Sequence, residues 1–209
     1  MIRNLVFDMG NVLIHYIPQV FMDRLGVPAE DQPLLAREVF GSVEWIRMDR
    51  GTLGQEEAVA AMEARLPRRL WEYARRLVLG WWLDGPLMPV EGMAALLEEL
   101  KGLGYGLYLL SNATVRQPEY FPGIPGSQFF DGAVISAHWK VLKPEREIYE
   151  ILFREYGLEP SECFFVDDLN INVEGALCAG MDGYIFDGDV GRLRQALCRA
   201  GVMVKTGED

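Results

Sequence analysis

The chain has 209 residues, and its 20 basic against 31 acidic side chains give a formal net charge of −11. Half of the residues are hydrophobic, which is typical of one large globular domain or of a core domain with a modest insert. Binding to nucleic acid or to an anionic membrane surface needs clustered Lys and Arg, so this acidic balance argues against both classes of partner.

Five short apolar runs predict the strands of a sheet. They occupy residues 5–7, 107–110, 133–135, 163–166 and 184–186. Runs this short that are apolar throughout are typical of strands buried on both faces. Several of them end in Asp or in Ser-Asn, which gathers polar side chains at the carboxyl edge of the expected sheet.

Helical patterns lie between these runs. Apolar residues recur at the helical spacing over residues 93–100, 148–152 and 173–177. Pro144 stands at a helix-start position before the second pattern, and Gly180 is expected to stop the third. Alternating strands and helices predict an α/β fold, a Rossmann-like parallel sheet sandwiched by helices.

Residues 16–85 differ because they contain no convincing strand. Helices are expected near 18–25, 31–40, 55–65 and 68–80, and Gly85-Pro86 and Met88-Pro89 mark the return to the sheet. We therefore predict a core domain of residues 1–15 and 86–209, with a helical cap of residues 16–85 inserted after the first strand. Trp81 and Trp82, near the junction, are the tryptophans most expected to border a pocket. A group of cap arginines is interpreted as a solvated helix face, with attraction of an anionic substrate as the alternative: Arg65, Arg68, Arg69, Arg75 and Arg76.

Polar residues at the strand ends suggest the chemistry. These residues are Asp8, Ser111, Asn112, Asp167 and Asp168, with Lys143 before a helix. Carboxylates suit a hard divalent cation such as Mg²⁺, and an ammonium with hydroxyl and amide donors suits a phosphoryl group. An Asp beside them could attack phosphorus and form an aspartyl-phosphate. Each Asp alone could be a simple cap, so the prediction rests on the whole set.

The ordered motifs resemble the haloacid dehalogenase superfamily, in the subfamily with an α-helical cap after the first strand. Phe7-Asp8-Met9-Gly10-Asn11-Val12 resembles the first motif, Leu110-Ser111-Asn112 the second and Lys143-Pro144 the third. Phe165-Val166-Asp167-Asp168 with Asn172 resembles the fourth. The resemblance covers most of the chain, and the predicted fold is the one it implies.

The resemblance also implies roles for individual residues. Asp8 is the expected nucleophile and a metal ligand, and the backbone carbonyl of Gly10 is a second ligand. Ser111 and Asn112 are expected to bind the phosphoryl group, together with Lys143, which stabilises its charge and keeps Asp8 ionised. Asp168 matches the metal-binding acid, and Asp167 is a neighbour that could ligate through water. The implied cofactor is Mg²⁺, and the implied partner is a small phosphorylated substrate.

Gly10 departs from the usual phosphatase motif, which has a second Asp two residues after the nucleophile. That Asp acts as general acid and base, a contribution worth about 10²–10⁴ in rate. The Asp-x-Gly-Asn-Val form, with Asn172 in place of a more usual Asp, resembles an α-D-glucose-1-phosphate phosphatase-like branch. His15 is the nearest titratable candidate for a replacement, although a loop histidine with no catalytic role is the simpler interpretation. His138 is expected to be a surface or packing residue.

Three functions follow as hypotheses. The first is a Mg²⁺-dependent phosphomonoester hydrolase acting on a small metabolite such as a sugar phosphate. The second is a metal-independent 2-haloacid dehalogenase, and the third is a catalytically weak protein that binds a phosphorylated metabolite.

Three cysteines without a C-x-x-C pair predict neither a disulfide framework nor a zinc site. Without an apolar run long enough for a membrane span or a signal peptide, we expect a cytoplasmic protein. A monomer or weak dimer is expected.

Overall fold

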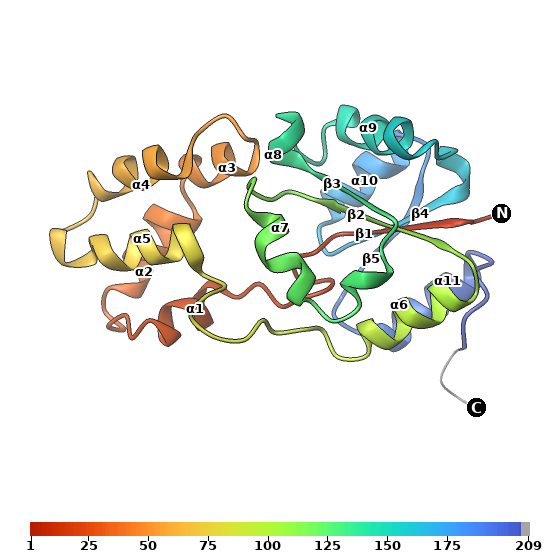
Figure 1. The fold of residues 1–209 in the computed structure, drawn as a ribbon, viewed down its shortest axis with the longest axis horizontal. Coiled ribbons are helices and arrows are strands. Elements are labelled where there is room, and N and C mark those ends of the chain that lie inside the picture. Colours follow the sequence, from red (N-terminus) through yellow and green to blue (C-terminus); the bar gives the residue numbers. More distant parts are fainter. Residues whose placement is uncertain (206–209) are drawn as a thin grey trace.

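A five-stranded parallel sheet lies at the centre of the computed structural model, which describes residues 1–205 (Figure 1). The strand order is β3-β2-β1-β4-β5, and each neighbouring pair is parallel. The strands are β1 Asn4–Phe7, β2 Gly106–Ser111, β3 Gly132–Ile135, β4 Cys163–Asp167 and β5 Asp182–Ile185. The α/β fold and all five predicted strands are confirmed.

Alternation along each strand sends side chains to two different helical layers. On β1, Leu5 and Phe7 belong to an apolar cluster with α6 and α11, whereas Val6 belongs to a second cluster with α9 and α10. The two layers cover opposite faces of the sheet in Figure 1. These helices are α6 Met93–Gly102, α9 Arg146–Tyr156, α10 Asn170–Cys178 and α11 Val190–Arg199. All three helical patterns predicted beside the strands therefore form helices.

Two expectations about this core were wrong. β5 is not buried on both faces: among residues 1–205 it is an edge strand paired with β4 alone, and Ile185 is 49% exposed. Pro144 does not start α9, which begins at Arg146 after a non-helical Glu145. The Lys143-Pro144 peptide bond is cis. The Asn112 side chain holds the backbone of Lys143, and the helix begins after this segment.

A helical lobe, which we define as Pro18–Gly80, lies beyond the carboxyl ends of the strands (Figure 1). The long cluster that covers one face of the sheet continues into this lobe without a break. The lobe comprises α1 Pro18–Arg24, α2 Gln32–Leu35 with a π-helical turn Ala36–Phe40, α3 Val43–Asp49, α4 Gln55–Glu63, a 3₁₀ turn Arg68–Leu70 and α5 Trp71–Gly80. The four predicted helical stretches are present, while the domain division itself stays a prediction.

Helix α3 was missed by the sequence patterns. The Ser42 hydroxyl caps it by accepting a hydrogen bond from the backbone N–H of Trp45 at 3.2 Å. Its apolar residues Val43 and Ile46 are 62% and 54% exposed, so they do not mark a buried face. The remaining elements are α7 Gln117–Tyr120, α8 Ser136–Trp139, and 3₁₀ turns at Phe121–Gly123, Ser127–Phe129 and Pro160–Glu162. Among residues 1–205, each helix is too short or too polar to cross a bilayer.

Candidate active site

Three neighbouring strands bring the central charged residues together. β1 pairs with β2 on one side and with β4 on the other, so the residues at their carboxyl ends share one edge of the sheet. The ammonium of Lys143 lies between two carboxylates, 2.8 Å from Asp8 Oδ1 and 2.6 Å from Asp167 Oδ2. All three residues are buried. The sequence prediction that Asp8, Lys143 and the Asp pair converge is thus correct in placement.

The electrostatics of this group give the Asp8 carboxyl a raised pKa that still lies below neutral pH. Burial raises the pKa of Asp8 to about 6, because the opposing effect of Lys143 is partly offset by the negative charge of Asp167. Burial alone would lower the pKa of Lys143, but Asp8 and Asp167 raise it above its ordinary value. At neutral pH, Asp8 is therefore an ionised carboxylate beside a fixed cation.

The Asn112 side chain holds the backbone of Lys143 from both sides. Its Oδ1 accepts from the Lys143 N–H at 2.8 Å, and its Nδ2 donates to the Lys143 carbonyl at 3.1 Å. With one amide hydrogen committed to Lys143, a phosphoryl oxygen could still be bound by the second amide hydrogen or by the backbone N–H of Asn112. Ser111, directly before it, is buried and lines the cavity described below.

Both carboxylate oxygens of Asp167 accept hydrogen bonds from protein groups. Asn172 Nδ2 donates to both of its carboxylate oxygens, at 3.0 and 3.1 Å, and the Leu169 N–H donates to Oδ1 at 2.8 Å. The Asn172 carbonyl in turn accepts from the Tyr149 hydroxyl at 2.7 Å. Asn172 therefore acts on the site through Asp167, which it orients toward Lys143.

An acidic cluster at the same edge fits a hard divalent cation. Asp8, Asp167 and Asp168 each place one carboxylate oxygen within 4.8 Å of the others. Asp168 accepts from Asn11 Nδ2 at 3.0 Å, and Asn11 Oδ1 accepts from the Tyr16 N–H, which steadies the loop that carries Gly10. Because the oxygens of Asp167 are already bonded, Asp8 and Asp168 are the carboxylates of this cluster with an oxygen left for a cation, and carboxylate oxygens are ligands that Mg²⁺ prefers.

A cavity of about 130 Å³ lies between the helical lobe and this charged edge. From the core it is lined by Asp8, Met9, Gly10, Ser111, Asn112, Ala113, Thr114 and Tyr120. From the lobe and the two segments that join it to the core, it is lined by Tyr16, Trp45, Met48, Asp49, Gln55, Val78, Trp81 and Trp82. The expectation that Trp81 and Trp82 border a pocket is confirmed.

Both histidines lie outside this cavity. His15 is exposed, while its neighbours Ile14 and Tyr16 point inward, because the His15 N–H pairs with the Met88 carbonyl where the chain leaves the core. The structure therefore does not bring His15 to the reacting groups. His138 is exposed on α8, as expected.

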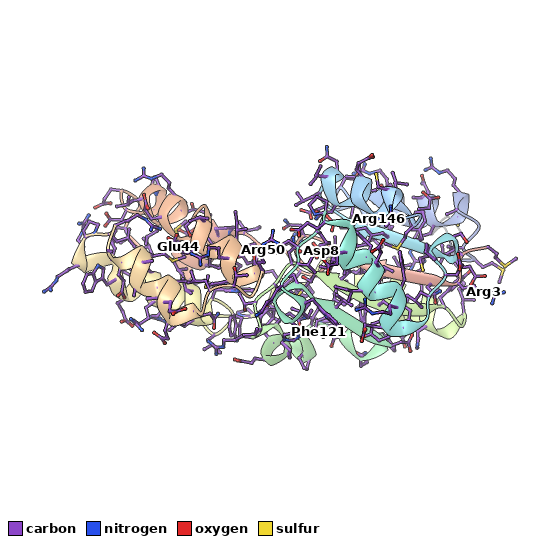
Figure 2. The ribbon with its side chains drawn as sticks, turned by 90° about the horizontal axis from the view of Figure 1, so that it is seen from above. Arg3, Asp8, Glu44, Arg50, Phe121 and Arg146 are labelled. Carbon is purple, nitrogen blue, oxygen red and sulfur yellow. The ribbon has the colours of Figure 1, made fainter. Side chains whose placement is uncertain are left out.

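The cap arginines also lie away from the cavity, and they are paired within the lobe or, for Arg76, with the segment that directly follows it. Arg65 binds Glu38 and Glu44, Arg69 binds Asp31, Arg75 binds Glu56 and Glu63, and Arg76 binds Asp84, while Arg68 stacks on Trp71. Figure 2 labels Glu44, a partner of Arg65, on the lobe. These pairs favour the interpretation as a structural face over attraction of a substrate.

Sequence analysis missed Asp49, the last residue of α3. It lines the cavity, and burial raises its pKa to about 8, with the charge of Asp8 acting in the same direction and the nearby Trp45 side chain opposing it. Tyr16 was missed as well: its hydroxyl is buried without a partner among residues 1–205. An isolated Asp before Arg-Gly carries no recognisable signal, since only docking of the lobe places it here.

The family model for haloacid dehalogenase-like hydrolases matches residues 2–180. The chain is 28% identical over 188 residues to the sesquiterpene phosphatase astK of Aspergillus oryzae, covering 85% of this chain and 86% of that protein. It is 26% identical over 185 residues to the D-ribitol-5-phosphate phosphatase of Bacteroides thetaiotaomicron, covering 83% and 86%.

The fold is similar to that of the enzyme bt-2542 from Bacteroides thetaiotaomicron, solved in complex with magnesium and inorganic phosphate. The TM-score is 0.65 with 21% sequence identity, and the match covers 100% of this chain and 97% of that structure. At 21% sequence identity, this similarity is evidence for the fold alone.

Proposed function

The chain belongs to the haloacid dehalogenase-like hydrolase family, and from that premise we propose that it is a Mg²⁺-dependent phosphomonoester hydrolase. The observation that carries the proposal is the buried Lys143 ammonium held between Asp8 and Asp167, with a third acidic residue, Asp168, close by and Asp8 lining a cavity. Two curated relatives are named as phosphatases, which supports a phosphate ester as substrate.

Asp8 is the proposed nucleophile. Its carboxylate oxygen attacks phosphorus, the bond between phosphorus and the ester oxygen breaks, and an aspartyl-phosphate forms. Water then cleaves this acyl phosphate and regenerates the Asp8 carboxylate. Lys143 contributes by keeping Asp8 ionised at neutral pH and by placing a positive charge beside the incoming phosphoryl oxygens.

The phosphoryl group is bound at the end of β2 in this proposal. The Ser111 hydroxyl, the backbone N–H of Asn112 and the Lys143 ammonium are its donors. The Asn112 side chain supports them indirectly, because it fixes the backbone of Lys143 at two points.

Asp8, Asp168 and the Gly10 carbonyl would hold Mg²⁺. The bound ion would neutralise the carboxylates and polarise the phosphoryl group. We assign Asp167 to holding Lys143, with any contact to the ion made through water. Residues 16–85 act as a cap that closes over this site, on a core of residues 1–15 and 86–209.

The organic part of the substrate is proposed to have an apolar body. Tyr16, Trp81 and Tyr120 form a contiguous aromatic wall, with the Trp81 ring centroid 5.2 Å from each of the other two. The unpartnered Tyr16 hydroxyl offers one buried donor for a ligand oxygen. This lining favours an alkyl or aromatic phosphate over the sugar phosphate expected from the sequence.

The test is phosphate release from a panel that includes sugar, alkyl and aryl phosphates. We expect release that requires Mg²⁺, stops with chelator and disappears in Asp8→Asn. Preference for alkyl or aryl esters would support the proposed apolar substrate. Preference for sugar phosphates would instead support the substrate class expected from the sequence.

Two other results would overturn the proposal. Halide release from a 2-haloacid without metal would assign a dehalogenase, an alternative kept open by Gly10. Saturable binding of a phosphorylated ligand without phosphate release would assign a binding protein.

A further inference from the structure

Hydrolysis of an alkyl phosphate needs a proton for the departing oxygen. An alkoxide is a poor leaving group, so a positioned acid contributes about 10²–10⁴ in rate. Neither histidine lines the cavity, and Gly10 has no side chain to offer. The donor must therefore be sought among the other titratable groups on the cavity wall.

Four titratable groups line the cavity, and three are unsuited to this task. Asp8 is the nucleophile of the proposed reaction. Burial raises the pKa of Tyr16 and of Tyr120 above the ordinary tyrosine value, which makes both weaker acids. Lys143, outside the lining set, is committed to Asp8 and Asp167. Asp49 remains.

The core fixes the position of Asp49 through its backbone. The Asp49 carbonyl accepts a hydrogen bond from the Ser136 hydroxyl at 2.5 Å, and the same hydroxyl oxygen accepts from the Ala113 N–H at 2.9 Å. Ser136 is fully buried at the start of α8, and Ala113 directly follows Asn112. A residue of the lobe is thus tied to the loop on which the phosphoryl group is proposed to bind.

The two residues after Asp49 complete this attachment. Arg50 forms an ion pair with Glu145, with 2.5 Å between Arg50 Nη2 and Glu145 Oε1. Glu145 is close in sequence to Lys143. Gly51 has a φ of +74°, and a Cβ placed there would lie 2.1 Å from the Ala137 carbonyl oxygen, so the backbones pack directly against one another. Figure 2 shows Arg50 at the end of the lobe that faces Asp8.

The surroundings of Asp49 favour a protonated carboxyl. The groups that face it are Asp8 across the cavity, Tyr16 and Tyr120 on the wall, and Trp45 one turn earlier in α3. Among these, Asp8 carries a negative charge and none carries a positive one. With its pKa raised to about 8, Asp49 keeps its proton at neutral pH.

We propose that Asp49 is the general acid of the reaction, delivered to the site by the helical lobe. The inference rests on the proposed phosphatase function. As Asp8 attacks phosphorus and the ester bond breaks, the Asp49 O–H bond breaks and its proton passes to the departing oxygen, giving a neutral alcohol and an Asp49 carboxylate. When water attacks the aspartyl-phosphate, this carboxylate takes one of its protons, so inorganic phosphate forms and both residues return to their initial states.

Two esters of similar size separate this role from a structural one. 4-Nitrophenyl phosphate releases a stabilised phenolate that needs no proton, whereas 2-phenylethyl phosphate releases an alkoxide. The quantity to compare is kcat/KM, because it reports the steps up to release of the alcohol and excludes hydrolysis of the aspartyl-phosphate. Wild type, Asp49→Asn and Asp8→Asn are measured with saturating Mg²⁺.

Asp49→Asn should lower kcat/KM for the alkyl ester by about 10²–10⁴ and change it for the aryl ester by less than about tenfold. Retained turnover of the aryl ester also shows that the variant is folded. An equal loss on both esters, or no loss on either, would overturn the role of Asp49 while leaving the phosphatase intact. If the wild type cleaves neither ester, the proposed function itself fails.

A second substitution tests the role from another direction. Gly10 has no positive φ, and a Cβ there would meet only Tyr16 Cβ, at 3.8 Å, so an Asp fits. Adding Gly10→Asp to Asp49→Asn should raise the ratio of kcat/KM for the alkyl ester to that for the aryl ester by at least about tenfold. Recovery of both esters to the same degree would indicate a structural defect and count against the proposal.

Discussion

Asn112 and Lys143 are joined at two points, with the amide of one side chain bonded to both the N–H and the carbonyl of the other residue's backbone. This pairing aims the Lys143 ammonium at Asp8. Asn112→Ala should therefore reduce kcat by about 10–100-fold through misplacement of Lys143, and lower the free energy of unfolding by about 1–2 kcal/mol. Steady-state kinetics and urea unfolding measure the two effects. An unchanged kcat would show that Lys143 needs no such support.

Lys143→Met should destabilise the protein strongly at neutral pH, because two buried carboxylates lose their shared cation. We expect a loss of about 3–5 kcal/mol at pH 8. The loss should shrink toward pH 5 as Asp8, whose pKa is raised to about 6, takes up a proton. Lys143 itself, whose pKa is raised, stays charged in wild type over this range. Denaturant unfolding at both pH values checks this. Adding Asp167→Asn should recover part of the stability, and a pH-independent loss would contradict the electrostatic cause.

Gly51→Ala should weaken the contact between lobe and core, since the new Cβ would meet the Ala137 carbonyl oxygen at 2.1 Å. We expect kcat/KM for an alkyl ester to fall by at least about tenfold. Gly26→Ala is the matched control, because Gly26 has a similar φ of +69° with no atom within 4 Å of the added carbon. Equal effects of the two substitutions would assign the loss to backbone strain alone.

Asp49→Asn should change how stability depends on pH. In the folded protein the pKa of Asp49 is raised from 3.8 to about 8, so between these values the unfolded state releases a proton that the folded state keeps. The wild type therefore loses stability as the pH rises through this window, and the Asn variant does not share this loss. Its advantage should be absent near pH 4 and reach about 5 kcal/mol near pH 8. Unfolding curves across this range measure it, and a constant difference would argue against a buried neutral carboxyl.

The core of the site was predictable because strand ends carry it. Asp8, Ser111 and Asp167 follow apolar runs, and parallel pairing alone brings such ends to one edge. Asp49 was not predictable in this way. Its place depends on how the lobe docks, and the features that fix the docking are backbone contacts at Ser136 and Gly51 that no periodic pattern encodes.

His15 is a residue that the sequence suggested for the site but that the structure places outside the cavity. Nearness in sequence to Asp8 made it the candidate for the missing acid, yet its side chain is exposed while that of Tyr16 lines the cavity. A difference of one residue in a loop decides which side chain faces the site, and hydrophobic patterning does not reach that resolution. The Asn112 amide was likewise assigned to the phosphoryl group, whereas its two bonds to Lys143 are visible only in three dimensions.

The apolar cluster that covers the α6 and α11 face of the sheet runs on into the helical lobe. The lobe therefore has no separate interior of its own, and its melting would expose side chains that also stabilise the sheet. Heat or denaturant should then remove both parts in one cooperative transition, with no intermediate in which the sheet stands and the lobe is unfolded. Movements of the lobe during turnover are correspondingly limited to shifts that keep this common interior closed.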